Sequence, residues 1–485
     1  MPTTRARSKA TRSSVPEIGQ RVGINQLPAE VLSNIFVICD RTWSPLDGYW
    51  KVFVCQTVVP AVCRYWRQVA FDTISLWNTI TLLDDPPWDF SKHCLAHAGP
   101  TALLDIDIDM QEDFWGDTEN GTLEDLVERA EEALAFIVKH GGIPSRWRSF
   151  SITTDVFLAQ LASIKLLGNS HFPSLISLEM IFTGPSEFED EDEFTLAEHI
   201  RSQPKLLFLE PPPKLRSVKL QGVPGPYLFG HRNHPQMVGL TCLELRFEDL
   251  YPRLADLNKM LNANPNLETL RLDSETTLES VNVDRKQLPK VHLPKLQSLS
   301  FVSVASPLWT LYAIGMLDVP NVVSFELTLG IMPYEHHREQ AGIRKLLDHI
   351  VGDESQTTPA PRFPSLRTLT LASEMPLGFQ HDIAAVLAAY PQLTELVLPQ
   401  CESLAPLLKR PWLAPSIERL RVGVKNLVQL KKVVNTRCKA RLPLRTVLVD
   451  DFELEVKVKQ SDRAQLKKYV DFALVLPNGE RLGDS

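Results

Sequence analysis

The segment Pro265–Leu272 reads PNLETLRL, and its pattern P-x-L-x-x-L-x-L decides the fold prediction. In its last four residues polar and leucine side chains alternate, which is the period of a short strand with one buried face. The proline that opens the segment ends a preceding helix and has no N–H to donate to a sheet. The segment therefore predicts a strand that is entered through a proline.

The same pattern returns along most of the chain. Further copies with the proline lie at residues 173–180, 213–220, 294–301, 320–327, 364–371, 391–398 and 415–422. Copies without it lie at 238–245 and 444–449, and degenerate copies at 102–109 and 147–154. Helical stretches between copies are expected at residues 254–261, 308–317, 340–350, 383–389 and 427–434. Strand, helix and next strand predict parallel pairing, and repetition of this unit predicts a stacked solenoid of the α/β class.

The composition excludes several classes of protein. The chain has 485 residues, of which 44% are hydrophobic and 23% charged, as in globular proteins. Its net charge of −8 argues against nucleic acid as the main partner of the whole chain. No apolar run approaches the ~18–20 residues of a membrane helix, and the N-terminus lacks the apolar centre of a signal peptide. We therefore expect no membrane partner and a cytoplasmic or nuclear location, or both.

Three segments are expected to lie outside the packed structure. Residues 1–21 are basic and predict a disordered tail, with a nuclear address or a nucleic-acid contact as the alternative. The run 187–193 holds six acids in seven residues and predicts a disordered loop insertion. Residues 477–485 are expected to form a short C-terminal tail.

Two amphipathic helices are predicted before the repeats. In the first, over residues 24–40, apolar side chains recur at i, i+1, i+4, i+5 and i+8. They are Val31, Leu32, Ile35, Phe36 and Cys39. A second helix is predicted over residues 58–71, followed by a short strand at 78–83. Neither helix can bury its stripe alone, so the two must pack together and leave some apolar surface for a partner helix.

The order LPAEVLSNIF (27–36), VCRYWRQVA (62–70) and LW (76–77) resembles the F-box, and specifically the F-box-like proteins of mushroom-forming fungi. This resemblance implies a helical module over residues 22–83 that docks onto a Skp-type adaptor, and through it a cullin, in an SCF-type ubiquitin ligase. The segment between the helices, 40–57, is longer than the ~2–8 residues of common helix connections. The alternative is that these helices merely cap the domain that follows.

The resemblance also assigns adaptor contacts to single residues. They match the family's Leu-Pro pair, its first helix and its later helix, and some from the later helix must belong to the internal core. The positions are Leu27, Pro28, Val31, Leu32, Ile35, Phe36, Val59, Val62, Cys63 and Trp66.

The repeats resemble leucine-rich repeats, which are a known companion of the F-box. This resemblance implies an irregular leucine-rich-repeat solenoid over residues 84–476, with a parallel sheet on its concave face. The Asn/Cys position of the family consensus is matched by Cys401 alone among nine copies. That departure favours an irregular arc over a regular horseshoe.

Strand residues between the leucines are expected on the concave face, where an unidentified target protein would bind. The charged candidates are Lys219, Glu244, Arg246, Arg271, Asp273, Glu326, Arg419 and Arg421. A mixed polar stripe is also what any solvated sheet face shows, so ordinary solvation is the alternative for each of them.

Motifs of catalysis are missing from the sequence. It contains no Gly-rich phosphate loop, no dinucleotide fingerprint, no nucleophile elbow and no HEXXH zinc motif. His93, Cys94 and His97, like His231 and His234, offer too few ligands for zinc. We therefore expect no enzyme activity, no metal and no cofactor. The leading hypothesis is a substrate-recognition subunit of an SCF-type ubiquitin ligase; the alternatives are an interaction scaffold outside a ligase and an enzyme built on the repeats.

Overall fold

The structure is a computed structural model of the 485-residue chain. It describes residues 24, 27–42, 54–116, 122–184, 206–229, 235–249, 251–277, 288–330, 336–352, 360–373, 380–399, 403–424, 427–450, 460–476, 479 and 481. The basic tail at 1–21, the acidic insertion at 187–193 and most of the tail at 477–485 lie outside the described residues. The chain forms two compact units, Met1–Thr79 with His93–Ala102 and Ile80–Lys92 with Leu103–Ser485, called here the helical unit and the sheet unit.

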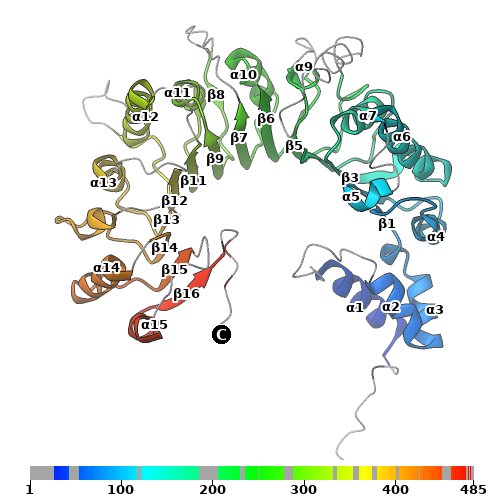
Figure 1. Cartoon of the computed structure of the whole chain (residues 1–485), viewed down its shortest axis with the longest axis horizontal. Helices are drawn as coiled ribbons and strands as arrows, with labels where there is room; N and C mark the ends of the chain where they lie inside the picture. Colours follow the sequence, from blue (N-terminus) through cyan, green and yellow to red (C-terminus); the bar gives the residue numbers. More distant parts are fainter. Residues whose placement is uncertain are drawn as a thin grey trace, which may run out of the picture. The chain divides into compact units, whose positions relative to one another are not determined.

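The helical unit consists of short helices that share one core. It contains α1 (Ala29–Thr42), α2 (Val54–Val62), α3 (Arg64–Asp72), the 3₁₀ turn η2 (Ile74–Leu76) and the end of α4 (Asp89–Ala98), drawn in blue in Figure 1. The buried apolar side chains include Leu32, Phe36, Cys55, Val59, Val69, Ala70, Leu76 and Trp77. Helices of this length are marginal alone in water, so the common core stabilises them.

The predicted single helix over residues 58–71 is wrong, because the chain breaks at Cys63 into α2 and α3. Cys63 has extended backbone angles, φ −159° and ψ 172°, and its Sγ accepts the backbone N–H of Trp66 at 3.5 Å. Cys63 thereby caps the N-terminus of α3. Across the break, Nε of Arg67 donates to the carbonyl of Pro60 at 2.9 Å, which ties α3 to α2.

The sheet unit contains a 14-stranded sheet whose strands follow one another in chain order. From β2 to β16 every pairing is parallel, as predicted. A separate two-stranded parallel sheet joins β8 (Val291–His292) to β10 (Leu317–Asp318). The strands of the large sheet are β1 (Thr79–Leu82), β2 (Leu104–Met110), β3 (Trp147–Thr154), β4 (Ser177–Phe182), β5 (Ser217–Gln221), β6 (Cys242–Asp249), β7 (Thr269–Thr277), β9 (Ser298–Val304), β11 (Ser324–Leu329), β12 (Thr368–Ser373), β13 (Glu395–Leu398), β14 (Arg419–Val422), β15 (Thr446–Asp450) and β16 (Asp471–Val475).

Helices of the sheet unit lie along one face of the sheet (Figure 1). They are α6 (Leu123–Lys139), α7 (Phe157–Gly168), α10 (Leu254–Asn262), α11 (Pro307–Met316), α12 (His336–Val351), α13 (Gln380–Ala389), α14 (Leu427–Lys439) and α15 (Gln460–Lys467). Shorter connecting elements are α5 (Glu112–Trp115), α9 (Gly225–Phe229), η4 (Pro144–Arg146) and η5 (Ala405–Leu408). Burial alternates along strands such as β2, β4 and β11, with the repeat leucines buried and the residues between them half-exposed. The half-exposed residues therefore share the helix-free face.

The strands predicted at the repeat copies are all present, and so are the helices predicted between them. Four strands differ from the prediction: β1, β16 and the short strands β8 and β10, which the repeat pattern did not predict. Strand β1 was assigned to the helical module, but it is the first strand of the large sheet and neighbours β2. Strand β16 was missed, because its sequence DFALV lacks the proline and the full leucine pattern.

Candidate functional site

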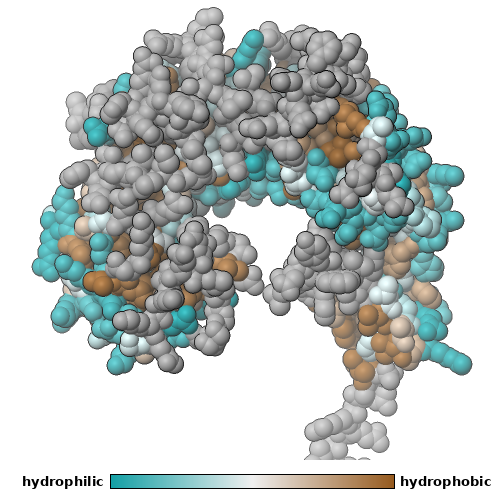
Figure 2. All heavy atoms as spheres, in the orientation of Figure 1, coloured by the Kyte–Doolittle hydropathy of each residue, from teal (hydrophilic) through white to brown (hydrophobic). Residues whose placement is uncertain are grey.

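The helical unit exposes large apolar side chains on two of its helices. Val31 and Ile38 on α1 are 43% and 59% exposed, and Val58 and Val62 on α2 are 54% and 53% exposed. Spacings of seven and four residues place each pair on one face of its helix. Figure 2 shows hydrophobic residues gathered on the surface of this unit. We call these four residues the apolar surface; contiguous exposed apolar patches are common at protein interaction sites.

The residues predicted to contact an adaptor occupy different depths in the helical unit. Pro28, Val31 and Val62 are exposed, and Leu27, Ile35, Cys63 and Trp66 are half-buried. Leu32, Phe36 and Val59 are 0%, 1% and 8% exposed. These last three form the core, so they stabilise the module and offer no surface to a partner.

Contacts between α1 and α3 hold the half-buried residues in place. The hydroxyl of Tyr65 donates to the carbonyl of Leu27 at 2.8 Å, and the rings of Phe36 and Trp66 lie 5.1 Å apart. The hydroxyl of Thr73 lies 2.9 Å from Ser33 Oγ. The start of α1 is thereby fixed to α3 before any partner arrives, which lowers the entropic cost of binding.

Three exposed side chains of the helical unit were missed by the sequence reasoning: Ile38, Val58 and Tyr65, the last of them 38% exposed. Apolar periodicity identifies the stripe that each helix buries, and these residues lie off that stripe. A signal was present, because Val58 precedes Val62 by four residues and Ile38 follows Val31 by seven.

The second candidate site is the helix-free face of the sheet. Register pairing brings four of the eight predicted charged residues into one row across β4 to β11, together with Glu179 and Ser300. The order is Glu179, Lys219, Glu244, Arg271, Ser300 and Glu326. Acid and base alternate along this row. Opposite charges on neighbouring strands each contribute roughly 0.2–1 kcal/mol, so the row also stabilises the sheet.

Ion pairs use several of the predicted target contacts. Lys219 Nζ lies 2.7 Å from Glu179 Oε1. Arg271 reaches across the small Ser300 to Glu326, with 2.6 Å between NH1 and Oε2. These charges are neutralised by neighbours on the same face, which is what a solvated structural role predicts; their contact with a target stays a prediction.

The last strands of the face carry two more pairs. Arg419 lies 2.7 Å from Glu395, and both side chains are partly exposed. Arg421 Nε donates to Asp450 Oδ1 at 2.7 Å, and Arg421 NH2 donates to the carbonyl of Leu476 at 3.2 Å. Burial raises the pKa of Asp450 despite the facing guanidinium. In this pair Asp450 is fully buried, whereas Arg421 keeps 20% of its side chain exposed on the helix-free face.

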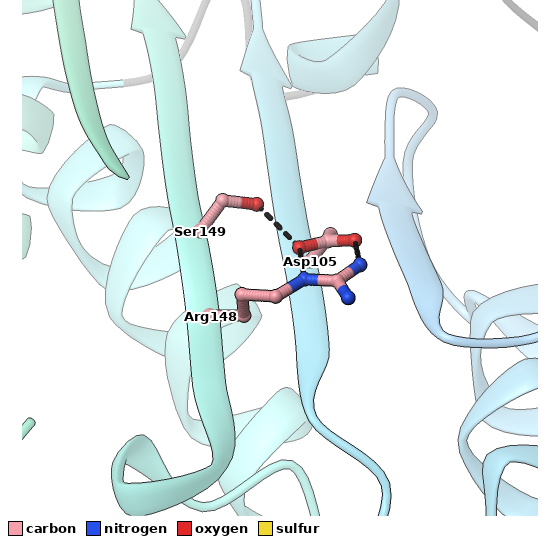
Figure 3. Close-up of polar contacts among 3 residues, drawn as sticks. All are labelled: Asp105, Arg148 and Ser149. Atoms are coloured by element: carbon pink, nitrogen blue, oxygen red, sulfur yellow. Dashed lines mark hydrogen bonds and ion pairs between the residues drawn. The ribbon is translucent and has the colours of Figure 1, made fainter. Parts of the chain in front are cut away.

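Asp105 on β2 is a polar centre that the charged-residue prediction left out (Figure 3). Its carboxylate accepts Nε of Arg148 at 2.9 Å and the hydroxyl of Ser149 at 2.8 Å, and NH2 of Arg148 donates to its other oxygen. The hydrogen bonds that Arg148 donates to Asp105 raise the pKa of Arg148. The signal was the alternation LDIDID, which places the aspartates on the face opposite the isoleucines.

A row of small side chains runs beside the charged row. Its members are register partners on consecutive strands from β3 to β12: Ser149, Ser177, Ser217, Cys242, Thr269, Ser298, Ser324 and Thr368. Short side chains here leave the neighbouring charged row uncovered from this side.

The described residues contain neither a cluster of metal ligands nor a membrane-spanning helix. Among them no group of three or more His, Cys, Asp or Glu side chains is placed to hold a metal ion. Likewise, none of the helices formed by these residues has the length and apolarity needed to cross a membrane.

The F-box-like family model matches residues 24–83 of the chain. The helical module is therefore an F-box-like domain, and F-box domains generally bind Skp-type adaptors. The matched segment contains α1 and α2, which carry the apolar surface, and also α3 and β1. No curated protein matches the chain.

Proposed function

We propose that the chain is the target-recognition subunit of an SCF-type E3 ubiquitin ligase. In this proposal the F-box-like domain binds a Skp-type adaptor, and through it a cullin, while the sheet unit binds a target protein. Holding both on one chain raises the effective concentration of the target near the ubiquitin-charged enzyme. The chain itself is non-catalytic.

The apolar surface of the F-box-like domain supports this proposal most directly. Val31, Ile38, Val58 and Val62 are each more than two-fifths exposed, although the core beneath them is closed. Covering such a side chain removes apolar area from water, at about 25 cal/mol per Å². A partner helix laid on this surface gains that free energy without disturbing the core.

Capture of a purified Skp-type adaptor tests the proposal. The double variant Val31→Asp/Val62→Asp places two charges on the apolar surface, and we expect capture to fall at least about tenfold. Leu27→Ala/Pro28→Ala removes the Leu-Pro pair and is expected to abolish capture.

The matched control is Ile143→Asp, which alters a 45%-exposed isoleucine of the sheet unit and should leave capture unchanged. Circular dichroism checks that each variant is folded. Failure of the wild-type chain to bind the adaptor, or an equal loss in the control, would remove the main support for the proposal.

We further propose that the sheet unit is an irregular leucine-rich-repeat solenoid of the kind found in F-box-like proteins of fungi. Each motif copy supplies one strand, and successive strands pair in parallel and in chain order. The target then contacts the helix-free face, where Lys219, Glu244, Arg246, Arg271, Asp273, Glu326, Arg419 and Arg421 lie.

Assembly with a cullin distinguishes a ligase subunit from a scaffold that acts outside a ligase. A reconstituted complex of chain, adaptor and cullin is expected to migrate as one species in size-exclusion chromatography. Adaptor binding without cullin recruitment would favour the scaffold. We also propose a cytoplasmic or nuclear location, or both, which imaging of a fluorescent fusion tests.

A further inference from the structure

The charge of the chain is unevenly distributed. Residues 403–485 hold 17 Lys and Arg against 9 Asp and Glu, a charge of +8 (17 − 9). The whole chain carries −8, so residues 1–402 carry −16. The C-terminal part is therefore basic within an acidic molecule.

Much of this positive charge lies in three neighbouring loops. Strands β14, β15 and β16 start in register, with Arg419 opposite Thr446 and Thr446 opposite Asp471. The segments that lead into them, 409–418, 439–445 and 467–470, therefore meet at one edge of the sheet. Backbone bonds of 2.8 Å join them directly, from Arg445 N to the Glu418 carbonyl and from Asp471 N to the Arg445 carbonyl.

Seven exposed cations line this edge, and we call them the basic edge: Lys409, Arg410, Lys439, Arg441, Arg445, Lys467 and Lys468. Two carboxylates accompany them, and each has a partner. Glu418 lies 3.2 Å from Arg445, and Asp471 lies 2.6 Å from Arg481. Seven cations and two carboxylates leave a formal charge of +5 (7 − 2).

Most of these cations face solvent without a counter-ion. Within the described part of the chain, no carboxylate forms an ion pair with Lys409, Arg410, Lys439, Arg441 or Lys468. The helix-free face differs, because its charges are matched on neighbouring strands. The basic edge thus offers a cluster of cations without counter-ions to an anionic partner.

Buried contacts fix the shape of this edge. Arg437 at the end of α14 is fully buried, and its NH2 donates to the carbonyl of Pro415 at 3.0 Å. The guanidinium carbons of Arg410 and Arg437 lie 5.3 Å and 5.9 Å from the centre of the Trp412 ring. The loops are therefore held before a partner binds, which reduces the entropic cost of binding.

We propose that the basic edge binds an acidic segment of a partner protein. Adjacent strands lie about 4.8 Å apart, so the edge spans roughly 10 Å, which suits a short extended segment. A long nucleic acid would also run along the acidic remainder of the chain, where like charges repel. Only the identification of this partner as the target protein rests on the proposed function.

Fluorescence anisotropy with the full-length chain tests this inference. The probe is a fluorescein-labelled peptide of alternating Glu and Ser, with a Gln-Ser peptide of equal length for comparison. The variant Lys439→Glu/Arg441→Glu/Lys468→Glu is expected to bind the acidic peptide at least about tenfold more weakly than the wild type. Wild-type binding should weaken as NaCl rises from about 50 to about 300 mM, because salt screens exposed charges.

The control variant Lys139→Glu/Lys259→Glu/Lys345→Glu makes the same charge change on exposed helical positions of the sheet unit. We expect it to bind within about twofold of the wild type, because these sites lie away from the edge. An equal loss in the control, or binding of the Gln-Ser peptide, would overturn the proposal. So would a single-stranded oligothymidine of equal charge that binds more tightly and depends on the same three residues.

Adaptor capture by the same variants separates this inference from the proposed function. The basic-edge variant should capture the Skp-type adaptor as the wild type does. Peptide binding that persists in a chain unable to capture the adaptor would contradict the ligase proposal and leave the basic edge standing. Adaptor capture without peptide binding would contradict the basic-edge proposal and leave the ligase proposal standing.

Discussion

Single buried side chains join one turn of the sheet unit to the turn before it. Asn264, which precedes a repeat proline, is fully buried. Its Oδ1 accepts the N–H of Leu240 at 2.9 Å, and its Nδ2 donates to the carbonyls of Met237 and Met260 at 3.1 and 2.8 Å. The repeat pattern predicted the strand that follows but assigned no role to this asparagine, because Leu240 and Met237, two of its three partners, lie on the preceding turn.

Replacing Asn264 should be costly. Asn264→Ala leaves the N–H of Leu240 and the carbonyl of Met237 without partners, at about 1–3 kcal/mol for each unsatisfied group, whereas the carbonyl of Met260 keeps the N–H of Ala263. We expect the thermal unfolding midpoint of the chain to fall by several degrees in calorimetry. The control Asn321→Ala removes one exposed bond, from Nδ2 to the Pro294 carbonyl at 2.8 Å, and should shift the midpoint much less. Equal shifts would contradict this role of Asn264.

His93 and His97 are structural residues of the helical unit. Their rings lie 4.1 Å apart, His97 stacks on Phe71 at 4.8 Å, and His93 meets the edge of Trp77 at 5.4 Å. Burial lowers the pKa of His93, and the neighbouring His97 lowers it further. Their sequence spacing allowed a metal ligand pair, whereas their rings belong to an aromatic cluster.

This lowered pKa makes the helical unit sensitive to acid. The pKa of a histidine in an unfolded chain is about 6.5, so below that pH the unfolded chain binds more protons than the folded chain. The contribution of neutral His93 to the stability of the folded chain is therefore fully present above the unfolded pKa and is lost as the pH falls. We expect faster amide exchange in α3 at about pH 5.5 than at about 7.5, after correction for intrinsic rates. His93→Gln should reduce this difference; an unchanged difference would exclude His93 as its source.

At the scale of the elements, the sequence predicted strands better than helix ends. A strand needs a few alternating residues and an entry signal, and the repeats supply both. The two helices on either side of Cys63 share one continuous stripe of Val59, Val62, Trp66 and Val69, so periodicity alone predicted one helix. The break depends on the backbone of Cys63 and on a thiol cap, which the stripe does not encode.

The capping position of α3 offers a direct test. A hydroxyl is a better N-cap than a thiol, so Cys63→Ser should stabilise α3 by roughly 0.5–1 kcal/mol. Hydrogen exchange of the α3 amides is expected to slow accordingly. Cys438→Ser, at an exposed position of α14, serves as the control and should change nothing. Faster exchange in the Cys63 variant would show that the thiol is needed for packing and not for capping.

The candidate sites were less predictable than the elements that carry them. Periodicity identified the apolar stripes of α1 and α2 but not the depth of each residue, so Leu32 and Phe36 were assigned to a partner although they form the core. On the sheet, Lys219 and Glu179 are 40 residues apart in sequence, and only the strand register brings them together. Charge pairs of this kind cannot be read from one strand.

At the scale of the whole molecule, the two units should respond separately to core damage. Leu32→Ala removes a fully buried side chain of the helical unit and should cost about 2–5 kcal/mol. Hydrogen exchange is expected to accelerate across α1 to α3 and to stay unchanged in β7 to β12. Leu270→Ala, fully buried in β7, should give the opposite pattern. Acceleration throughout the chain in either variant would show that the units unfold together.

The chain order of the strands has a consequence for synthesis. Each strand of the large sheet pairs with the strand made just before it, apart from the small separate pair of β8 and β10. A strand can therefore find its partner as soon as its own repeat has left the ribosome, without waiting for residues still to be translated. The nascent sheet grows by one strand at a time, and the last strands to join it, β14 to β16, are those whose entry segments carry the basic edge.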